Sequence, residues 1–256
     1  MISKVIHYCW LSGDPFPDLV GKCIASWKEK LPDYELVLWN SEKIDMVFGA
    51  TDGSSVHGNL WLRQSIQNKK YAFSADYIRV YALYHYGGIY LDADVEISGS
   101  FEPFLKNNIF IGFEYNNDLE PAIIGSIPKQ PWIKDLLDYY ENRSFIKEDG
   151  TFDIRTLPTI FNESAIRLFN FKRNGRFQMI IDQGIFIYPH DYFSPKNVYF
   201  NKIKETKNTI AIHHFDGNWV ERNLLYYLKR IIHQSLYILC GKKYHNKIVQ
   251  IYRGDR

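Results

Sequence analysis

Apolar residues recur along the chain with two spacings, and each spacing predicts a different kind of element. Short apolar runs predict buried strands at residues 4–10, 35–39, 89–91, 109–113, 184–188 and 209–215. Apolar residues repeated at helical spacing predict helices at residues 18–30, 75–86, 132–141 and 158–168. Because the chain opens with a strand, a helix and a second strand, we expect an α/β fold with a parallel sheet covered by helices.

The segment from residue 74 to residue 94 has the clearest local pattern. Ser74 is expected to cap the helix that follows it, since a serine side chain accepts from the first free backbone N–H groups. Gly87 and Gly88 are expected to end that helix, because glycine readily adopts the positive φ found at helix ends. The next apolar run leads directly into Asp92 and Asp94.

A further helical pattern occupies residues 221–239. Its residues on one side are Leu224, Leu228, Ile231, Ile232, Ser235, Leu236 and Leu239. Residues 221–256 contain eight Lys or Arg and two acidic residues, a net charge of +6; since the whole chain carries +2, the rest carries −4. The pattern favours either an amphipathic helix lying on anionic lipid or a helix packed on the domain or on a second subunit. The sequence does not separate these alternatives.

Composition, cysteine spacing and the lengths of apolar runs indicate the compartment in which the protein is expected. The 256 residues are 46% hydrophobic and 23% charged, as in ordinary soluble proteins. The three cysteines are odd in number and lack zinc-site spacing, which favours a reducing compartment. The sequence shows neither a secretory signal nor an apolar run of about 18 residues. We therefore expect a cytoplasmic protein, peripheral at most at the inner face of the cell membrane, with no nucleic-acid partner.

Asp92 and Asp94 are the main candidates for chemistry. Residues i and i+2 of an extended strand face the same way, so both carboxylates are expected to enter one crevice beyond the strand end. Oxygen ligands suit Mn²⁺ or Mg²⁺, which commonly join carboxylates to substrate phosphates. The alternative for an isolated pair is two solvated acids in a turn.

The surrounding residues carry a family resemblance. The block at residues 74–94, SADYIRVYALYHYGGIYLDAD, resembles the DXD region of glycosyltransferase family 32, and residues 7–10 and 213–219 agree with it. The family is similar to the glucosylating domains of large clostridial toxins and to capsular polysaccharide transferases. The resemblance implies a GT-A type fold, with a Rossmann-like central mixed sheet flanked by helices. We expect this domain at residues 1–220 and a basic amphipathic helical tail at residues 221–256.

The resemblance also implies roles for individual residues. Trp10 is expected to stack on the donor base, and Tyr90 to approach the phosphates. Asp76 is expected to contact the ribose or sugar, and Arg79 the sugar hydroxyls or diphosphate. Each has a structural alternative: Trp10 as a core ring, Tyr90 as a strand aromatic, Asp76 as a favourable charge at a helix N-terminus, and Arg79 as its helical ion-pair partner.

The remaining implied roles concern the metal and the closing of the site. Asp94 is expected to bind the metal directly, with Asp92 binding sugar or ribose and a metal-bound water. His214 is the expected third ligand; in an extended strand only one of the adjacent His213 and His214 can reach the ion.

Asn218 and Trp219 are also implied in the donor site, Trp219 at the leaving diphosphate, although Asn218 stands where many relatives have serine. Asp182 is expected among the catalytic residues on the acceptor side, or as a turn-capping residue.

These residues predict a metal-dependent, retaining glycosyltransferase. A nucleotide-diphosphate sugar is the expected donor, with UDP favoured, and a saccharide or lipid-linked saccharide the expected acceptor, in bacterial capsule or O-antigen synthesis. The alternatives are a mannosyltransferase using a GDP-mannose type donor and a noncatalytic saccharide-binding or assembly protein. A phosphatase with an Asp-x-Asp nucleophile fits poorly, because Val95 and Glu96 follow the pair.

Overall fold

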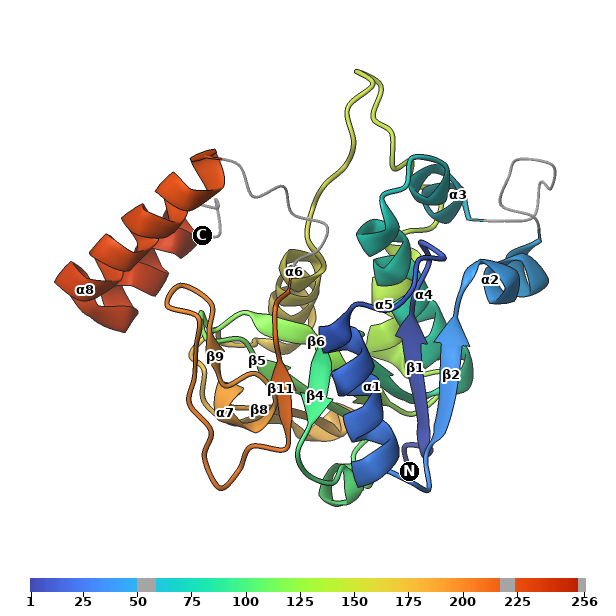
Figure 1. The fold of residues 1–256 in the computed structure, drawn as a ribbon, viewed down its shortest axis with the longest axis horizontal. Helices are drawn as coiled ribbons and strands as arrows, with labels where there is room; N and C mark the ends of the chain where they lie inside the picture. Colours follow the sequence, from blue (N-terminus) through green and yellow to red (C-terminus); the bar gives the residue numbers. More distant parts are fainter. Residues whose placement is uncertain (50–58, 217–223, 253–256) are drawn as a thin grey trace.

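A seven-stranded mixed sheet forms the centre of the computed structural model, which describes residues 1–49, 59–216 and 224–252 (Figure 1). The strand order is β2-β1-β3-β6-β5-β8-β7. The strands are β1 (Val5–Cys9), β2 (Glu35–Trp39), β3 (Gly88–Leu91), β5 (Ile109–Phe113), β6 (Leu119–Ser126), β7 (Gln178–Ile180) and β8 (Ile185–Tyr188). β2, β1 and β3 are parallel, β6 runs antiparallel between β3 and β5, and β8 is parallel to β5. This confirms the expected α/β class with a mixed sheet.

Helices cover both faces of the sheet and enclose two apolar cores. One core contains residues of α2 (Ser41–Phe48), α3 (Leu60–Gln67), α4 (Tyr71–Tyr86), α5 (Pro131–Asp138) and α6 (Leu157–Phe169). The other contains residues of α1 (Asp18–Lys30), of the short helix η1 (Glu102–Phe104) and of α7 (His190–Phe193). In β3, Tyr90 belongs to the first core, whereas Ile89 and Leu91 belong to the second, because successive strand residues face opposite sides.

Among the residues that the structure describes, two small antiparallel pairs of strands lie outside the main sheet. β4 (Val95–Ile97) pairs with β11 (Ala211–His213), and β9 (Lys196–Asn197) pairs with β10 (Lys202–Ile203). In the first pair, β4 begins at Val95, directly after Asp94. This pairing brings a segment from late in the chain to the aspartate pair.

The start of α4 corrects one prediction. The helix begins at Tyr71, and Ser74 lies inside it, so Ser74 is not its N-cap. Instead, the buried Ser74 hydroxyl lies 2.8 Å from the Ser65 hydroxyl of α3 and shares a hydrogen bond with it. The apolar period alone could not locate this boundary, because the first turn is capped by no side chain.

The end of α4 follows the prediction. Gly87 and Gly88 have φ of 66° and 95°, a region that residues with a Cβ rarely adopt. At Gly88 a Cβ would also lie 2.7 Å from the Val5 carbonyl oxygen. The glycine therefore allows β3 to start directly against β1.

The last helix, α8 (Leu224–Tyr252), is longer than the predicted one and is interrupted at Gly241, which has φ of 73° and ψ of 166°. Residues 221–223 lie outside the described part of the chain. One side of α8 packs on the domain: Arg230 Nε and Gln234 Nε2 donate to the Tyr199 carbonyl at 3.1 and 2.7 Å. Tyr237 shares a 2.7 Å hydrogen bond with Tyr115.

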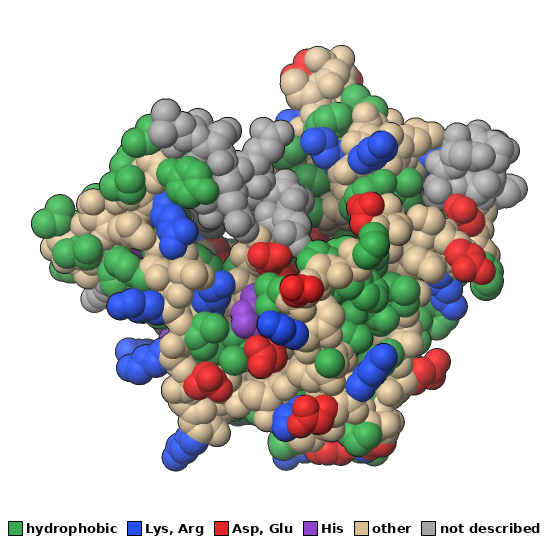
Figure 2. All heavy atoms as spheres, viewed as in Figure 1, with side chains coloured by type: hydrophobic (Ala, Val, Ile, Leu, Met, Phe, Trp, Pro, Cys, Tyr) green, Lys and Arg blue, Asp and Glu red, His purple; other side chains and the backbone are tan. Residues whose placement is uncertain are grey.

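The opposite side of α8 leaves its apolar residues in solvent, where Figure 2 shows hydrophobic side chains gathered over the helix. Its exposed apolar residues include Leu228, Ile231, Ile232, Ile238 and Leu239. No described helix is long and apolar enough to cross a bilayer. The division at residue 220 remains a prediction, because the residues around it are not among those described.

Candidate metal and donor site

Asp92 and Asp94 lie in a tight turn that joins β3 to β4. Asp92 N–H continues the sheet by donating to the Ala122 carbonyl at 2.9 Å, and the Asp92 carbonyl accepts from Val95 N–H at 3.0 Å. The pair therefore lies in a turn and not in a continuous extended strand. The two carboxylates meet at one cluster as expected, but not through strand alternation. The turn directs the two carboxylates to different partners that belong to one cluster.

Arg79 of α4 holds Asp92. Its Nη2 donates to Asp92 Oδ1 at 2.7 Å and lies 3.6 Å from Asp76 Oδ1, so the arginine serves both carboxylates. Its guanidinium carbon lies 4.4 Å from the centre of the Tyr90 ring. Arg79 therefore pairs with Asp76 on its own helix and at the same time binds Asp92 in the turn after β3.

Burial shifts the ionisation of these groups. Burial raises the pKa of Asp76 to about 7 although Arg79 acts the other way, and it raises the pKa of Asp92 above its ordinary value. Loss of water disfavours the charged carboxylate, and Arg79, joined by His213 at Asp92, offsets this only in part. A cation bound beside these carboxylates would favour their charged forms.

His213 reaches the aspartates through the pairing of β11 with β4, in which His213 lies opposite Val95. His213 Nε2 is 3.4 Å from Asp94 Oδ1, and Nδ1 is 3.1 Å from Glu120 Oε2. Burial disfavours the charged ring, yet the carboxylates of Glu120 and Asp94 raise the pKa of His213 well above its ordinary value. His213 in turn lowers the pKa of Asp94, against the effect of burial.

His214 faces the other way, which corrects the prediction that it is the third ligand. Its Nε2 lies 2.9 Å from Glu96 Oε2, at the protein surface. The expectation that only one of the two histidines faces the aspartates is met, but by His213. The sequence could not select between them without the register of β11 on β4.

The donor atoms fit a divalent cation. One oxygen each of Asp92 and Asp94 and one nitrogen of His213 all lie within 4.8 Å of one another. Two carboxylates and one imidazole suit Mn²⁺ and similar ions, and Mg²⁺ accepts the oxygens. The three side chains thus form a candidate site for a divalent metal.

The remaining residues predicted for the donor site differ in where the structure places them. Trp10 follows β1, which is parallel to β3, so Trp10 lies at the same edge of the sheet as Asp92. Its indole Nε1 donates to the Asp14 carbonyl at 2.7 Å. Tyr90 is 1% exposed, and its ring packs against the Arg79 guanidinium. Its approach to the donor phosphates remains a prediction. Asn218 and Trp219 lie outside the described residues.

Asp182 lies away from this site. It belongs to the short helix η2 (Ile181–Gln183), just before β8. β8 is parallel to β5, and β5 runs in the same direction as β3 because both are antiparallel to β6. The residues before β8 are therefore at the opposite edge of the sheet from the residues after β3. The structure does not support the predicted catalytic place of Asp182.

Glu120 is the site residue that the sequence analysis missed. It stands near the start of β6, whose residues are all buried. A single acid within a buried apolar run was the available signal, but Pro121 weakened the strand pattern around it.

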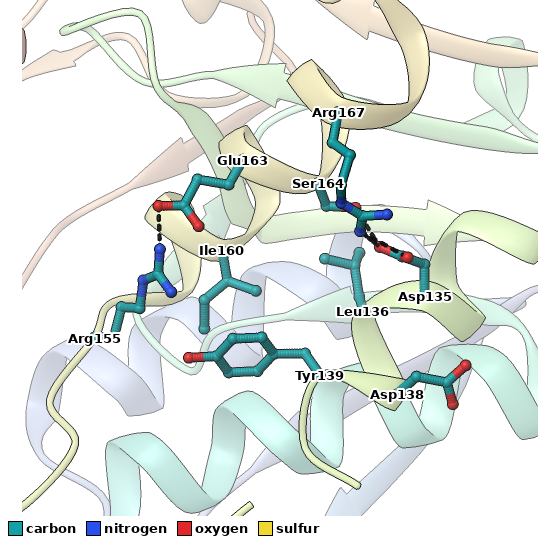
Figure 3. A pocket seen from close by; sticks show the side chains of 9 residues that line it. All are labelled: Asp135, Leu136, Asp138, Tyr139, Arg155, Ile160, Glu163, Ser164 and Arg167. Carbon is teal, nitrogen blue, oxygen red and sulfur yellow. Dashed lines mark hydrogen bonds and ion pairs between the residues drawn. The ribbon is translucent and has the colours of Figure 1, made fainter. Parts of the chain in front are cut away.

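A separate cavity of about 360 Å³ lies between α5 and α6 (Figure 3). Four of its charged side chains form pairs: Arg155 pairs with Glu163, and Arg167 Nη2 donates to both oxygens of Asp135 at 2.7 Å. The fifth, Asp138, pairs with Lys134 outside the cavity lining. Since each of these charges has a partner within the protein, we assign the cavity no role.

Comparison with known proteins agrees with the geometry. Residues 17–111 match the family model described as "Glycosyltransferase sugar-binding region containing DXD motif". Over these residues, which are less than half of the chain, it is similar to the glycosyltransferases that contain this region. The match includes Asp76, Arg79, Asp92 and Asp94.

Two yeast proteins are among its relatives. The chain is 30% identical over 147 residues to mannosyl phosphorylinositol ceramide synthase CSH1 of Saccharomyces cerevisiae, covering 56% of this chain and 37% of that protein. It is 36% identical over 136 residues to inositol phosphoceramide mannosyltransferase 3 of Schizosaccharomyces pombe, covering 52% and 35%. This chain thus covers little more than a third of each relative. Among solved structures, PaToxG glycosyltransferase is similar, with 21% identity, a TM-score of 0.48 and coverage of 65% of this chain and 68% of that one.

Proposed function

We propose that this protein is a divalent-metal-dependent glycosyltransferase that moves a sugar from a nucleoside diphosphate to an acceptor hydroxyl. The observation that carries the proposal is the meeting of Asp92, Asp94 and His213 at the sheet edge where Arg79 and Asp76 also lie. A bound cation would neutralise the diphosphate as it departs from the sugar. We name Mn²⁺ first, because the set includes an imidazole, and Mg²⁺ second.

The protein's own groups position the reactants. Arg79 keeps the Asp92 carboxylate in place through its charged hydrogen bond. The side chains of Asp92 and Asp94 stay 28% and 17% exposed, so an ion can reach both. Asp76 lies beside them and offers a hydrogen-bonding group for a ribose or sugar hydroxyl. Trp10, at the same edge, is the proposed stacking partner of the base, and Asn218 and Trp219 are proposed to complete the donor site.

A mannosyl donor is our proposal for the sugar. The names of the yeast relatives support it, since both are described as mannosylating enzymes. It takes precedence over the UDP-sugar that the sequence analysis favoured. Retention of anomeric configuration remains a prediction.

We propose a lipid-borne acceptor at a membrane surface. The second relative is named for a lipid, inositol phosphoceramide, and α8 exposes apolar residues within a basic segment. Placement of the acceptor in bacterial capsule or O-antigen synthesis is a further prediction.

A panel of nucleotide sugars tests the proposal. With Mn²⁺ present, hydrolysis or transfer is expected with GDP-mannose and is expected to stop on addition of EDTA. Asp94→Asn should abolish the reaction, whereas Asp138→Asn, an exposed acid of α5, should leave it unchanged. A reaction that persists in EDTA or in Asp94→Asn contradicts the proposal. Tight nucleotide binding without any turnover would instead favour a noncatalytic protein.

A further inference from the structure

Glu120 is a buried carboxylate with a complete set of partners. Its side chain is 2% exposed. Oε1 accepts from Ala122 N–H at 3.1 Å, and Oε2 accepts from the Ser194 hydroxyl at 3.1 Å. The same Oε2 lies 3.1 Å from His213 Nδ1. Burying a carboxylate is costly unless hydrogen-bond donors surround it, so these contacts stabilise the Glu120 side chain in its buried position.

The contacts fix the orientation of the His213 ring. Nδ1 faces Glu120, and Nε2 faces Asp94 at 3.4 Å. Glu120 is held by the backbone of β6 and by Ser194 after α7, whereas Asp94 lies in the β3–β4 turn. The imidazole is therefore held between β6 and the turn that follows its neighbouring strand β3.

A histidine that binds a metal through one nitrogen needs a proton on the other. A carboxylate that accepts from that second N–H selects the ligating tautomer and keeps the ring from rotating. Glu120 meets this requirement at Nδ1, which leaves Nε2 for the ion.

We propose that Glu120 is the positioning residue of the metal site, holding His213 with Nδ1–H toward Glu120 and Nε2 toward Asp92 and Asp94. The inference rests on the metal-dependent function proposed above and adds a residue to that site. Glu120 itself does not touch the ion or the donor.

Glu96 provides a matched comparison. It pairs with the neighbouring His214 at 2.9 Å, but its side chain is 47% exposed and that histidine faces away from the aspartates. The two Glu–His pairs thus differ in one respect: in the first pair the other ring nitrogen of the histidine faces the aspartates, and in the second it does not.

Titration of the intact protein with Mn²⁺, followed by electron paramagnetic resonance of the free ion, tests the proposal. Glu120→Gln is expected to weaken Mn²⁺ binding by about 10- to 100-fold, the usual effect of losing such a partner. Glu96→Gln is expected to keep the parent affinity. Parent-like Mn²⁺ affinity in Glu120→Gln, or equal loss in both variants, overturns the proposal.

Two further measurements guard against a merely structural effect. Circular dichroism in EDTA shows whether Glu120→Gln is folded; if it is not, Glu120→Asp keeps the charge, shortens the reach to His213 and should still weaken Mn²⁺ binding. In the parent protein loaded with Mg²⁺, nitrogen NMR of His213 should show a proton on Nδ1 and none on Nε2. The opposite tautomer overturns the proposal without any variant.

The metal titration contains no sugar donor, so its result is independent of transfer. A weakened ion site in Glu120→Gln supports the positioning role even if the parent transfers no sugar, in which case only the proposed function fails. Conversely, a parent enzyme that transfers sugar while Glu120→Gln binds Mn²⁺ normally removes the positioning role alone.

Discussion

Arg79 Nη2 donates a 2.7 Å hydrogen bond to Asp92 Oδ1 while its guanidinium lies over the Tyr90 ring. The three residues come from the middle of α4, from the end of β3 and from the turn after it. One buried arginine therefore joins the helix to the aspartate pair. The contacts of Arg79 thus connect the two ends of the segment from residue 74 to residue 94.

Arg79→Lys is expected to damage both the fold and the site. Lysine keeps the charge but loses the planar group that bonds Asp92 and covers the Tyr90 ring. We expect a loss of about 1.5–3 kcal/mol in the free energy of unfolding, the range for a hydrogen bond to a charged group, together with a large fall in transfer rate. Urea denaturation and the transfer assay measure the two effects.

Arg143→Lys is the control for that variant. Arg143 also lies over a tyrosine, 4.0 Å from the centre of the Tyr139 ring, and pairs with Asp153, but it is partly exposed. Its replacement should cost about 1 kcal/mol or less and leave transfer unchanged. Similar losses of stability and of transfer rate in both variants would show that Arg79 contributes no more than an ordinary arginine–tyrosine contact.

His7 should make the protein less stable in acid. Trp39 Nε1 donates to His7 Nδ1 at 3.3 Å, and His7 Nε2 lies 3.0 Å from the Gly87 carbonyl, an arrangement that needs a neutral ring. Burial lowers the pKa of His7 to about 4 from an ordinary value of 6.5. The folded state then binds fewer protons than the unfolded state, so stability is lost as pH falls from about 6.5 toward 4.

His7→Gln tests this assignment, since glutamine can donate and accept without titrating. The variant should be less stable than the parent at pH 7, and the difference in melting temperature should shrink as pH falls to 4. A difference that stays constant with pH would mean that His7 does not contribute to acid sensitivity.

Gly88→Ala should destabilise the junction of α4 and β3. The backbone has φ of 95°, and the new Cβ would lie 2.7 Å from the Val5 carbonyl oxygen. Backbone strain of this kind costs about 1–3 kcal/mol, and the contact adds to it. Denaturant unfolding should show the loss.

Gly21→Ala separates this effect from glycine replacement in general. Gly21 lies inside α1, and a Cβ there would meet nothing within 4 Å. Alanine at this position should stabilise the protein by about 0.5–1 kcal/mol. Destabilisation at Gly21, or none at Gly88, would contradict the explanation.

The exposed face of α8 should bind anionic lipid. Ile231 and Ile232 are each 57% exposed, so replacing both by serine should reduce sedimentation with phosphatidylserine vesicles and leave the melting temperature nearly unchanged. Ile166→Ser, on α6 and 50% exposed, should bind vesicles like the parent. Unchanged binding in the α8 variant would instead favour a helix that packs on protein.

Local sequence patterns predicted much of the fold because helix and strand formation depend largely on residues that are close together in the chain. The bounds of α1, β2 and β5 match their predictions, and the glycines after α4 were recognised from their backbone freedom. Family resemblance located the aspartates and Arg79. These features depend on residues close together in the chain.

The missed features depend on pairing between distant residues. The choice of His213 over His214 follows from the register of β11 on β4, which no local period contains. Asp182 was misplaced because its position depends on the direction of β8 relative to β3. Glu120 was missed because a strand buried on both faces has no alternation of polar and apolar residues.

The antiparallel contact of β11 with β4 makes the cluster depend on nearly the whole chain. Asp216 N–H donates to Asp94 Oδ2 at 2.8 Å across 122 positions of sequence, next to the His213 contact. A ligand that bridges these two segments binds only when both have reached their native places. Binding of such a ligand should therefore delay unfolding and protease cleavage of both segments together, so that protection of one segment reports on the other.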